Sequence, residues 1–178
     1  YGVVDFKNDE ADIRGVFDFA KKMGIGTVVC EPAFDDWTLL ARLAREYSLN
    51  IAVHNHPLPS KYAKPEAVYE RIKGLDKRFG ACVDNGHWTR AGVKTADALS
   101  LLRGRILDIH LKDLDSASPE AVDVPFGQGV SAVRDILAEL TRQKYSGYIT
   151  IEYENPNEFD DPSPSVRKCV QFLKDAAK

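Results

Sequence analysis

Two kinds of hydrophobic pattern alternate along the chain. Short runs in which apolar residues recur at every second position predict β-strands, and longer runs with a spacing of three to four predict amphipathic helices. The predicted strands are Gly2–Phe6, Thr27–Glu31, Asn50–His56, Gly80–Asp84, Ile106–Lys112 and Tyr148–Glu154. The predicted helices are Asp9–Met23, Asp36–Tyr47, a helix beginning at Pro65, Thr95–Leu102, Ser131–Gln143 and Ser163–Ala176. Such alternation predicts an α/β fold with a parallel sheet and right-handed crossovers.

Six βα units fit either an open doubly wound sheet or six units of an eight-fold barrel, which typically needs about 250 residues. The two faces of the predicted strands separate these alternatives. In 106–112, one face carries Leu107, Ile109 and Leu111, and the other carries Asp108, His110 and Lys112. A doubly wound sheet is covered by helices on both faces and should be apolar on both. The pattern therefore predicts a TIM (β/α)8-type barrel whose polar strand ends line the mouth.

Acidic or histidine side chains stand at the C-terminal ends of five successive predicted strands. They are Glu31, His54 with His56, Asp84 with His87 just beyond, His110 with Lys112, and Glu152 with Glu154. Active sites of barrels lie at this end of the strands, and buried charges are costly unless they are paired or bind a metal. Mixed imidazole and carboxylate ligands suit Zn²⁺, Mn²⁺, Fe²⁺ or Co²⁺ better than Ca²⁺. We therefore expect a divalent metal site at the mouth.

Several of these side chains also have structural interpretations. His56 precedes Pro57, so its ring can simply hold a loop. His87 follows Gly86 in a turn-like sequence and can contact substrate or serve the turn. Lys112 can pair with Asp113 or Glu152, although its strand-end position favours contact with a substrate oxygen.

Other residues near the predicted mouth also have two interpretations. Asp108 is placed deeper, as an interior carboxylate. Trp37 and Trp88 follow strands, so each can stack on a sugar or pack over the rim. The segment 124–129 has no nucleotide-binding spacing, and we expect it to fold back over the mouth.

Composition narrows the function further. The net charge is −3, and no cluster of Lys and Arg suits a phosphate backbone, so a nucleic-acid partner is not expected. No apolar run approaches the roughly 20 residues that span a bilayer. The three cysteines, Cys30, Cys82 and Cys169, have no metal-finger spacing and predict no disulfide framework. The sequence begins without Met or a signal peptide, so either its true start has been removed or it is part of a longer sequence. The location stays open, and a cytoplasmic one is favoured over a periplasmic or secreted one.

Four motifs resemble the xylose isomerase-like barrel superfamily, in its sugar phosphate isomerase/epimerase group. They are Val53-His54-Asn55-His56-Pro57, Cys82-Val83-Asp84-Asn85-Gly86-His87-Trp88, Asp108-Ile109-His110-Leu111-Lys112-Asp113 and Ile151-Glu152-Tyr153-Glu154. The similarity runs from Tyr1 to the C-terminus. It implies one barrel domain, 1–178, that lacks roughly its first two βα units.

The resemblance implies a metal held by Glu, Asp, His and Glu at the ends of strands five to eight. Asp84, His110 and Glu152 match the last three, whereas His54 replaces the first glutamate. Glu31 can compensate, as ligand or as base. In the isomerases and epimerases, two metal-bound glutamates move a proton beside a metal-polarised carbonyl. Replacing one by histidine makes proton abstraction followed by elimination equally reasonable.

The first hypothesis is therefore a divalent-metal-dependent (Mn, Zn, Mg or Co) isomerase or epimerase of a small keto-sugar, and the second is a lyase or hydrolase of a keto-sugar or keto-glycoside. We predict catalytic roles for Glu31, His54 and Glu152, and substrate contacts for the residues His56, His87, Trp88, Lys112 and Glu154. A DNA-repair endonuclease of the same barrel is disfavoured by the acidic balance. An inert fragment is the fourth hypothesis. Its open strand edges would favour homo-oligomers.

Overall fold

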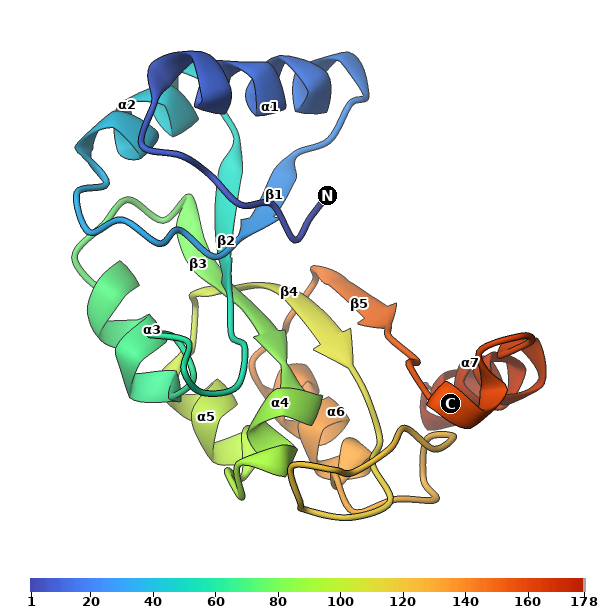
Figure 1. Cartoon of the computed structure of the whole chain (residues 1–178). Helices are drawn as coiled ribbons and strands as arrows, with labels where there is room; N and C mark the ends of the chain where they lie inside the picture. The colour runs from blue at the N-terminus through green and yellow to red at the C-terminus, as the bar shows by residue number, and fades with distance from the viewer. Residues whose placement is uncertain (178) are drawn as a thin grey trace.

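A single parallel sheet, curled like part of a barrel, organises the molecule (Figure 1). The computed structural model describes residues 1–177. The strands are β1 (Thr27–Cys30), β2 (Asn50–His54), β3 (Phe79–Asp84), β4 (Ile106–Leu111) and β5 (Tyr148–Ile151), and they neighbour one another in chain order. Every pairing is parallel. The barrel-type α/β fold expected from the strand faces is confirmed.

One helix precedes the first strand and the others follow strands, and together they surround the curled sheet. They are α1 (Glu10–Lys22), α2 (Thr38–Tyr47), α3 (Pro65–Ile72), α4 (Asn85–Arg90), α5 (Thr95–Leu101), α6 (Val133–Arg142) and α7 (Ser163–Ala176), with a short 3-10 helix at Pro156–Glu158. Asp9 caps α1 through a hydrogen bond from the Asp12 amide, and Pro65 occupies the first turn of α3. Within residues 1–177, no helix combines the length and apolarity that crossing a membrane requires.

Apolar side chains form two clusters, one on each side of the sheet. The large cluster joins the outer strand face, for example Val53, Val83 and Ile109, to the helices. The small cluster lies inside the curl and consists of Val29, Ala52 and Cys82, with Leu107 packed against it. The inner face is thus apolar at its deep end and polar at the strand ends, which places the site at the mouth.

The predicted strand at residues 2–6 is not formed as a strand. Residues 1–4 instead run along β1, where Val4 makes one isolated parallel bridge to Cys30. The Val29 amide donates to Tyr1 O at 2.7 Å, and the Val4 amide donates to Val29 O at 2.9 Å. The segment therefore covers the outer edge of β1 without extending into a regular strand.

Strand β4 also departs from the prediction, because its register against β3 shifts between Ala81 and Cys82. Ala81 pairs with Ile106, whereas Cys82 pairs with Asp108, so Leu107 is the extra residue of a β-bulge. Leu107 consequently joins the inner cluster instead of the outer face on which alternation placed it. Gly80 leaves room for it: a Cβ there would lie 2.6 Å from Leu107 Cγ.

Several boundaries also move. Glu31, His56, Lys112, Glu152 and Glu154 stand just beyond their strands rather than within them. The sequence around His87, interpreted as a turn, forms the short helix α4, whose first turn is capped by Asp84. The segment after β4 wraps around the buried Asp113: its carboxylate accepts hydrogen bonds from the amides of Gly127, Gly129 and Ser131. Asp113 thus serves this loop and is not the partner of Lys112.

Candidate metal centre

Four strand-end side chains meet on the inner side of the sheet. His54 ends β2, Asp84 ends β3, His110 lies on β4, and Glu152 follows β5. One potential ligand atom from each lies within 4.8 Å of the others. Parallel strands bring their C-terminal ends to one edge, and the registry that pairs Asp84 with His110 fixes these two side by side.

The ligand atoms of this group lack ordinary hydrogen-bond partners. Within residues 1–177, both ring nitrogens of His54, Asp84 Oδ2, His110 Nδ1 and Glu152 Oε2 are buried and make no hydrogen bond. His110 Nδ1 lies 3.0 Å from Glu152 Oε2 without hydrogen-bond geometry. Because buried polar atoms are rarely left unpaired, this set fits a bound cation. Two imidazoles and two carboxylates suit Zn²⁺, Mn²⁺ or Co²⁺.

Lys112 supplies a buried positive charge beside the carboxylates. Its Nζ lies 3.5 Å from Asp84 Oδ2 and 3.5 Å from Glu152 Oε2, and it pairs with Glu154. Burial alone would lower the pKa of Lys112, but the three carboxylates raise it overall. Asn85 fixes its backbone, accepting from the Lys112 amide at 2.7 Å and donating to its carbonyl at 2.8 Å.

Burial and neighbouring charges shift the pKa values of these groups in different directions. Burial raises the pKa of Asp84, whereas His110 and Lys112 overcome burial and lower the pKa of Glu152. Burial lowers the pKa of His54 to about 3 and that of His87 to about 3, with neighbouring positive groups contributing. Both imidazoles are therefore neutral near pH 7, so each has one lone pair available for a metal ion.

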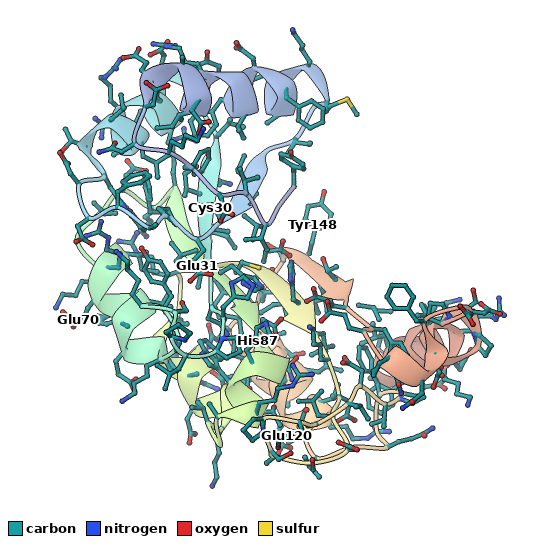
Figure 2. The ribbon with its side chains drawn as sticks, viewed as in Figure 1. Cys30, Glu31, Glu70, His87, Glu120 and Tyr148 are labelled. Carbon is teal, nitrogen blue, oxygen red and sulfur yellow. The ribbon has the colours of Figure 1, made fainter. Side chains whose placement is uncertain are left out.

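Glu31 lies in a separate, adjacent arrangement near the centre of the molecule (Figure 2). Its two oxygens contact His56 Nδ1 and Ser60 Oγ. Glu31, His54 and His56 form a second group of ligand atoms within 4.8 Å, but Glu31 is not a member of the group around Asp84. Of the two candidates for the fourth ligand, the one placed beside Asp84, His110 and Glu152 is His54.

The predicted substrate-contact residues fall into two sets. His56 and Glu154 are accessible at the mouth, with 42% and 60% of their side chains exposed. His87 is mostly buried, with Nε2 3.5 Å from Asp84 Oδ2. Trp88 lies in α4 and is fully buried in the hydrophobic core, and Trp37 is buried at the start of α2. Trp37 ends the loop after β1, as expected, whereas Trp88 lies in a helix; burial supports packing for both indoles.

Two residues near the centre had no predicted role in the site. Cys82 Sγ lies within 4.8 Å of a nitrogen of His54 and of His110. One feature of the sequence indicates this position: Cys82 stands two residues before Asp84, so the two side chains lie on the same face of the strand. Asp123, in the loop after β4, is buried, and within residues 1–177 its oxygens accept no hydrogen bond, although Oδ2 forms an ion pair with Arg90 Nη2 at 3.6 Å. Burial raises the pKa of Asp123 to about 6, and its cavity of about 390 Å³ also includes His87 and Glu154. No local pattern marks Asp123, because its position depends on how the loop folds.

Comparison with known proteins identifies several similar chains. The family model described as xylose isomerase-like TIM barrel matches residues 7–176. A solved protein from Parabacteroides distasonis ATCC 8503 is 32% identical, with a TM-score of 0.71, over 98% of this chain and 68% of that one. The solved IolI protein with a bound zinc atom is 17% identical, with a TM-score of 0.78, over 93% of this chain and 68% of that one. At that identity, the likeness concerns the fold.

A curated relative is named inosose dehydratase 2, from Bacillus cereus. It is 24% identical over 155 residues, which is 78% of this chain and 51% of the relative. The chain thus spans about half the length of that relative.

Proposed function

Since the chain belongs to the xylose isomerase-like TIM-barrel family, we propose that its strand-end centre binds one divalent cation and isomerises a small keto-sugar. The observation that carries this proposal is the convergence of His54, Asp84, His110 and Glu152, whose buried ligand atoms make no hydrogen bond within residues 1–177. A bound divalent cation would supply Lewis-acid polarisation of the substrate carbonyl.

Glu152 is the proposed base. Its side chain is 30% exposed, whereas that of Asp84 is fully buried, so Glu152 is the carboxylate that a substrate can reach. Its lowered pKa keeps it ionised near pH 7 and ready to accept a proton from the carbon beside the carbonyl. Lys112 holds both Glu152 and Glu154 in place from beneath.

The opposite side of the site favours isomerisation over epimerisation. Epimerisation needs a second base on the other face of the carbon, and His54 stands where the family resemblance places that glutamate. His54 is only 2% exposed, whereas Glu152 is 30% exposed, so the His54 ring is closed to a substrate carbon. Glu31 is engaged by His56 and Ser60. A single base removes and returns the proton on one face, which is sufficient for aldose–ketose isomerisation.

Elimination is the second candidate, and the Glu31–His56 pair favours it. His56 lies at the mouth, with its ring centroid 4.4 Å from that of His54, and is paired with a carboxylate. Such a pair can protonate a leaving hydroxyl, or the aglycone of a keto-glycoside, after Glu152 removes the neighbouring proton. The name of the curated relative, inosose dehydratase 2, agrees with this chemistry.

Incubation of the Mn²⁺-loaded full chain with keto-sugars in D₂O tests both candidates. Deuterium in an isomeric sugar, at the carbon beside the carbonyl, supports isomerisation. Loss of water or of an aglycone supports elimination. Metal analysis accompanies the assay: substoichiometric metal that does not rise on reconstitution would contradict both.

Glu152→Gln tests the proposed base. Because an amide cannot accept the proton, we expect turnover to fall by about 10²- to 10⁴-fold. The matched control is Glu66→Gln, which alters an exposed glutamate on α3 and should leave turnover unchanged. Equal activity of the Glu152→Gln variant and the wild-type protein would exclude Glu152 as the base.

A further inference from the structure

Cys82 lies in the barrel interior, one step deeper than Asp84. The two residues are separated by one position on β3 and therefore share a face. Cys82 is fully buried and packs with Val29, Ala52 and Leu107 at the deep end of the curl. The proposed reaction gives this thiol no role.

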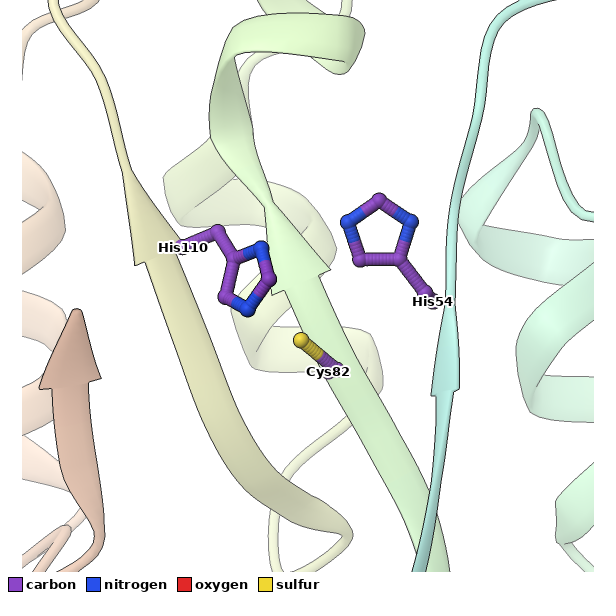
Figure 3. A group of neighbouring side chains, drawn as sticks. All are labelled: His54, Cys82 and His110. Atoms are coloured by element: carbon purple, nitrogen blue, oxygen red, sulfur yellow. The ribbon is translucent and has the colours of Figure 1, made fainter. Parts of the chain in front are cut away.

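Two histidines place nitrogen atoms beside this thiol. Figure 3 shows the sulfur of Cys82 lying between His54 of β2 and His110 of β4, and one nitrogen from each ring lies within 4.8 Å of the sulfur and of the other. His54 is only 2% exposed, and neither of its ring nitrogens has a hydrogen-bond partner among residues 1–177. A neutral imidazole offers one lone pair, so His54 and His110 can serve either an ion among the carboxylates or an ion that also contacts the Cys82 sulfur.

We propose that His54, Cys82 and His110 form a second ion position beneath the carboxylates, one that takes thiophilic ions such as Zn²⁺, Co²⁺ or Cd²⁺. Thiolate sulfur favours these ions over Mg²⁺ and Mn²⁺, which prefer oxygen. Two imidazoles and one thiolate are a three-ligand set of the kind that zinc enzymes use while keeping a fourth position open. When the ion binds, the thiol proton leaves to solvent and sulfur forms the metal bond.

This inference rests on the proposed function only through the two shared histidines. It adds that the chemical nature of the ion decides where it binds. Ions that prefer oxygen stay with Asp84 and Glu152, and thiophilic ions engage Cys82.

Titration of the reduced full chain with Co²⁺ tests the inference. A thiolate–cobalt charge-transfer band in the near ultraviolet is expected for the wild type and should vanish in Cys82→Ser. The matched controls are Cys30→Ser and Cys169→Ser, which alter equally buried free thiols outside the group and should keep the band. Cd²⁺ affinity of Cys82→Ser should fall by at least about 10-fold, the lower bound typical for loss of a supporting group, while Mn²⁺ affinity should stay unchanged.

X-ray absorption of the Zn²⁺-loaded wild type gives a readout that needs no variant. A sulfur scatterer at about 2.3 Å supports the inference, and a shell containing nitrogen and oxygen alone overturns it. Persistence of the cobalt band in Cys82→Ser would also overturn it. Co²⁺ binding without the band would show that Cys82 is not a ligand and would leave the proposed function intact. The band without turnover of any keto-sugar would support Cys82 as a ligand and contradict the proposed function.

Discussion

At the scale of single residues, burial explains why a histidine suits position 54 better than a carboxylate. Asp84 and Glu152 already bring two carboxylates close to Lys112. A third carboxylate at position 54 would have to be buried next to them, which is costly. The imidazole of His54 is neutral, because burial lowers its pKa to about 3, and it still offers a lone pair. A histidine at this position therefore keeps a possible metal ligand without adding a third buried negative charge.

Asp123 gives a prediction about pH. Burial raises the pKa of its carboxyl to about 6, above the unfolded value of about 3.9. Its contribution to the free energy of unfolding is therefore fully present below about pH 3.9 and is lost as the pH rises through about 6. Asp123→Asn cannot titrate, so relative to the wild type it should gain stability between about pH 4 and about pH 8, by up to about 3 kcal/mol.

Urea unfolding of the metal-free wild type and Asp123→Asn, at about pH 4 and at about pH 8, measures this gain in the free energy of unfolding. Asp160→Asn is the matched control, since Asp160 is exposed, and its difference from the wild type should not vary with pH. A constant difference for Asp123→Asn would show that the Asp123 carboxyl does not titrate in this range.

At the scale of elements, the β3–β4 pair shows where period-two reasoning fails. Alternation along 106–112 assigned Leu107 to the outer face, but the bulge turns it inward against Gly80. The polar positions Asp108 and His110 were assigned to the interior, and the register aligns them with Cys82 and Asp84 of β3. Thus the bulge changes one side chain at the deep end without disturbing the site.

Gly80→Ala tests this close approach. The added Cβ would collide with Arg105 O and lie 2.6 Å from Leu107 Cγ, so we expect a loss of about 3 kcal/mol in the free energy of unfolding, the upper end for overpacking. Gly15→Ala is the matched control: Gly15 lies in the middle of α1 with nothing within 4 Å of its added Cβ. This control should gain about 1 kcal/mol. Urea unfolding of each variant and of the wild type measures both changes in the free energy of unfolding. Equal stability of Gly80→Ala and wild type would contradict the bulge.

At the scale of the whole molecule, the two edges of the curled sheet differ. Residues 1–4 cover the edge of β1, but no strand in residues 1–177 pairs with the outer edge of β5. Tyr148 on β5 is 81% exposed. An open strand edge with an exposed aromatic side chain promotes pairing with another chain.

We therefore expect the 178-residue chain on its own to self-associate, and Tyr148→Lys to shift it toward monomer, because a charged edge resists pairing. Sedimentation velocity across a range of protein concentrations measures the shift. Phe159→Lys is the control, since Phe159 is 87% exposed but lies beyond the strand. A wild-type chain that stays monomeric at every concentration would contradict this prediction.

The sequence by itself determined the alternation of strands and helices, the barrel-type curl and the edge that carries the polar side chains. These features follow from local periodicity, which each segment expresses independently of its neighbours. The helix α4 was missed because its six residues include a Gly and no helical apolar pattern, and its Asp84 cap precedes it as the last residue of β3. Only the tertiary structure decided that His54 rather than Glu31 stands beside Asp84, that Cys82 approaches two histidines, and that Trp88 is buried. Distances between side chains of different strands depend on register and curl, and no single segment contains that information.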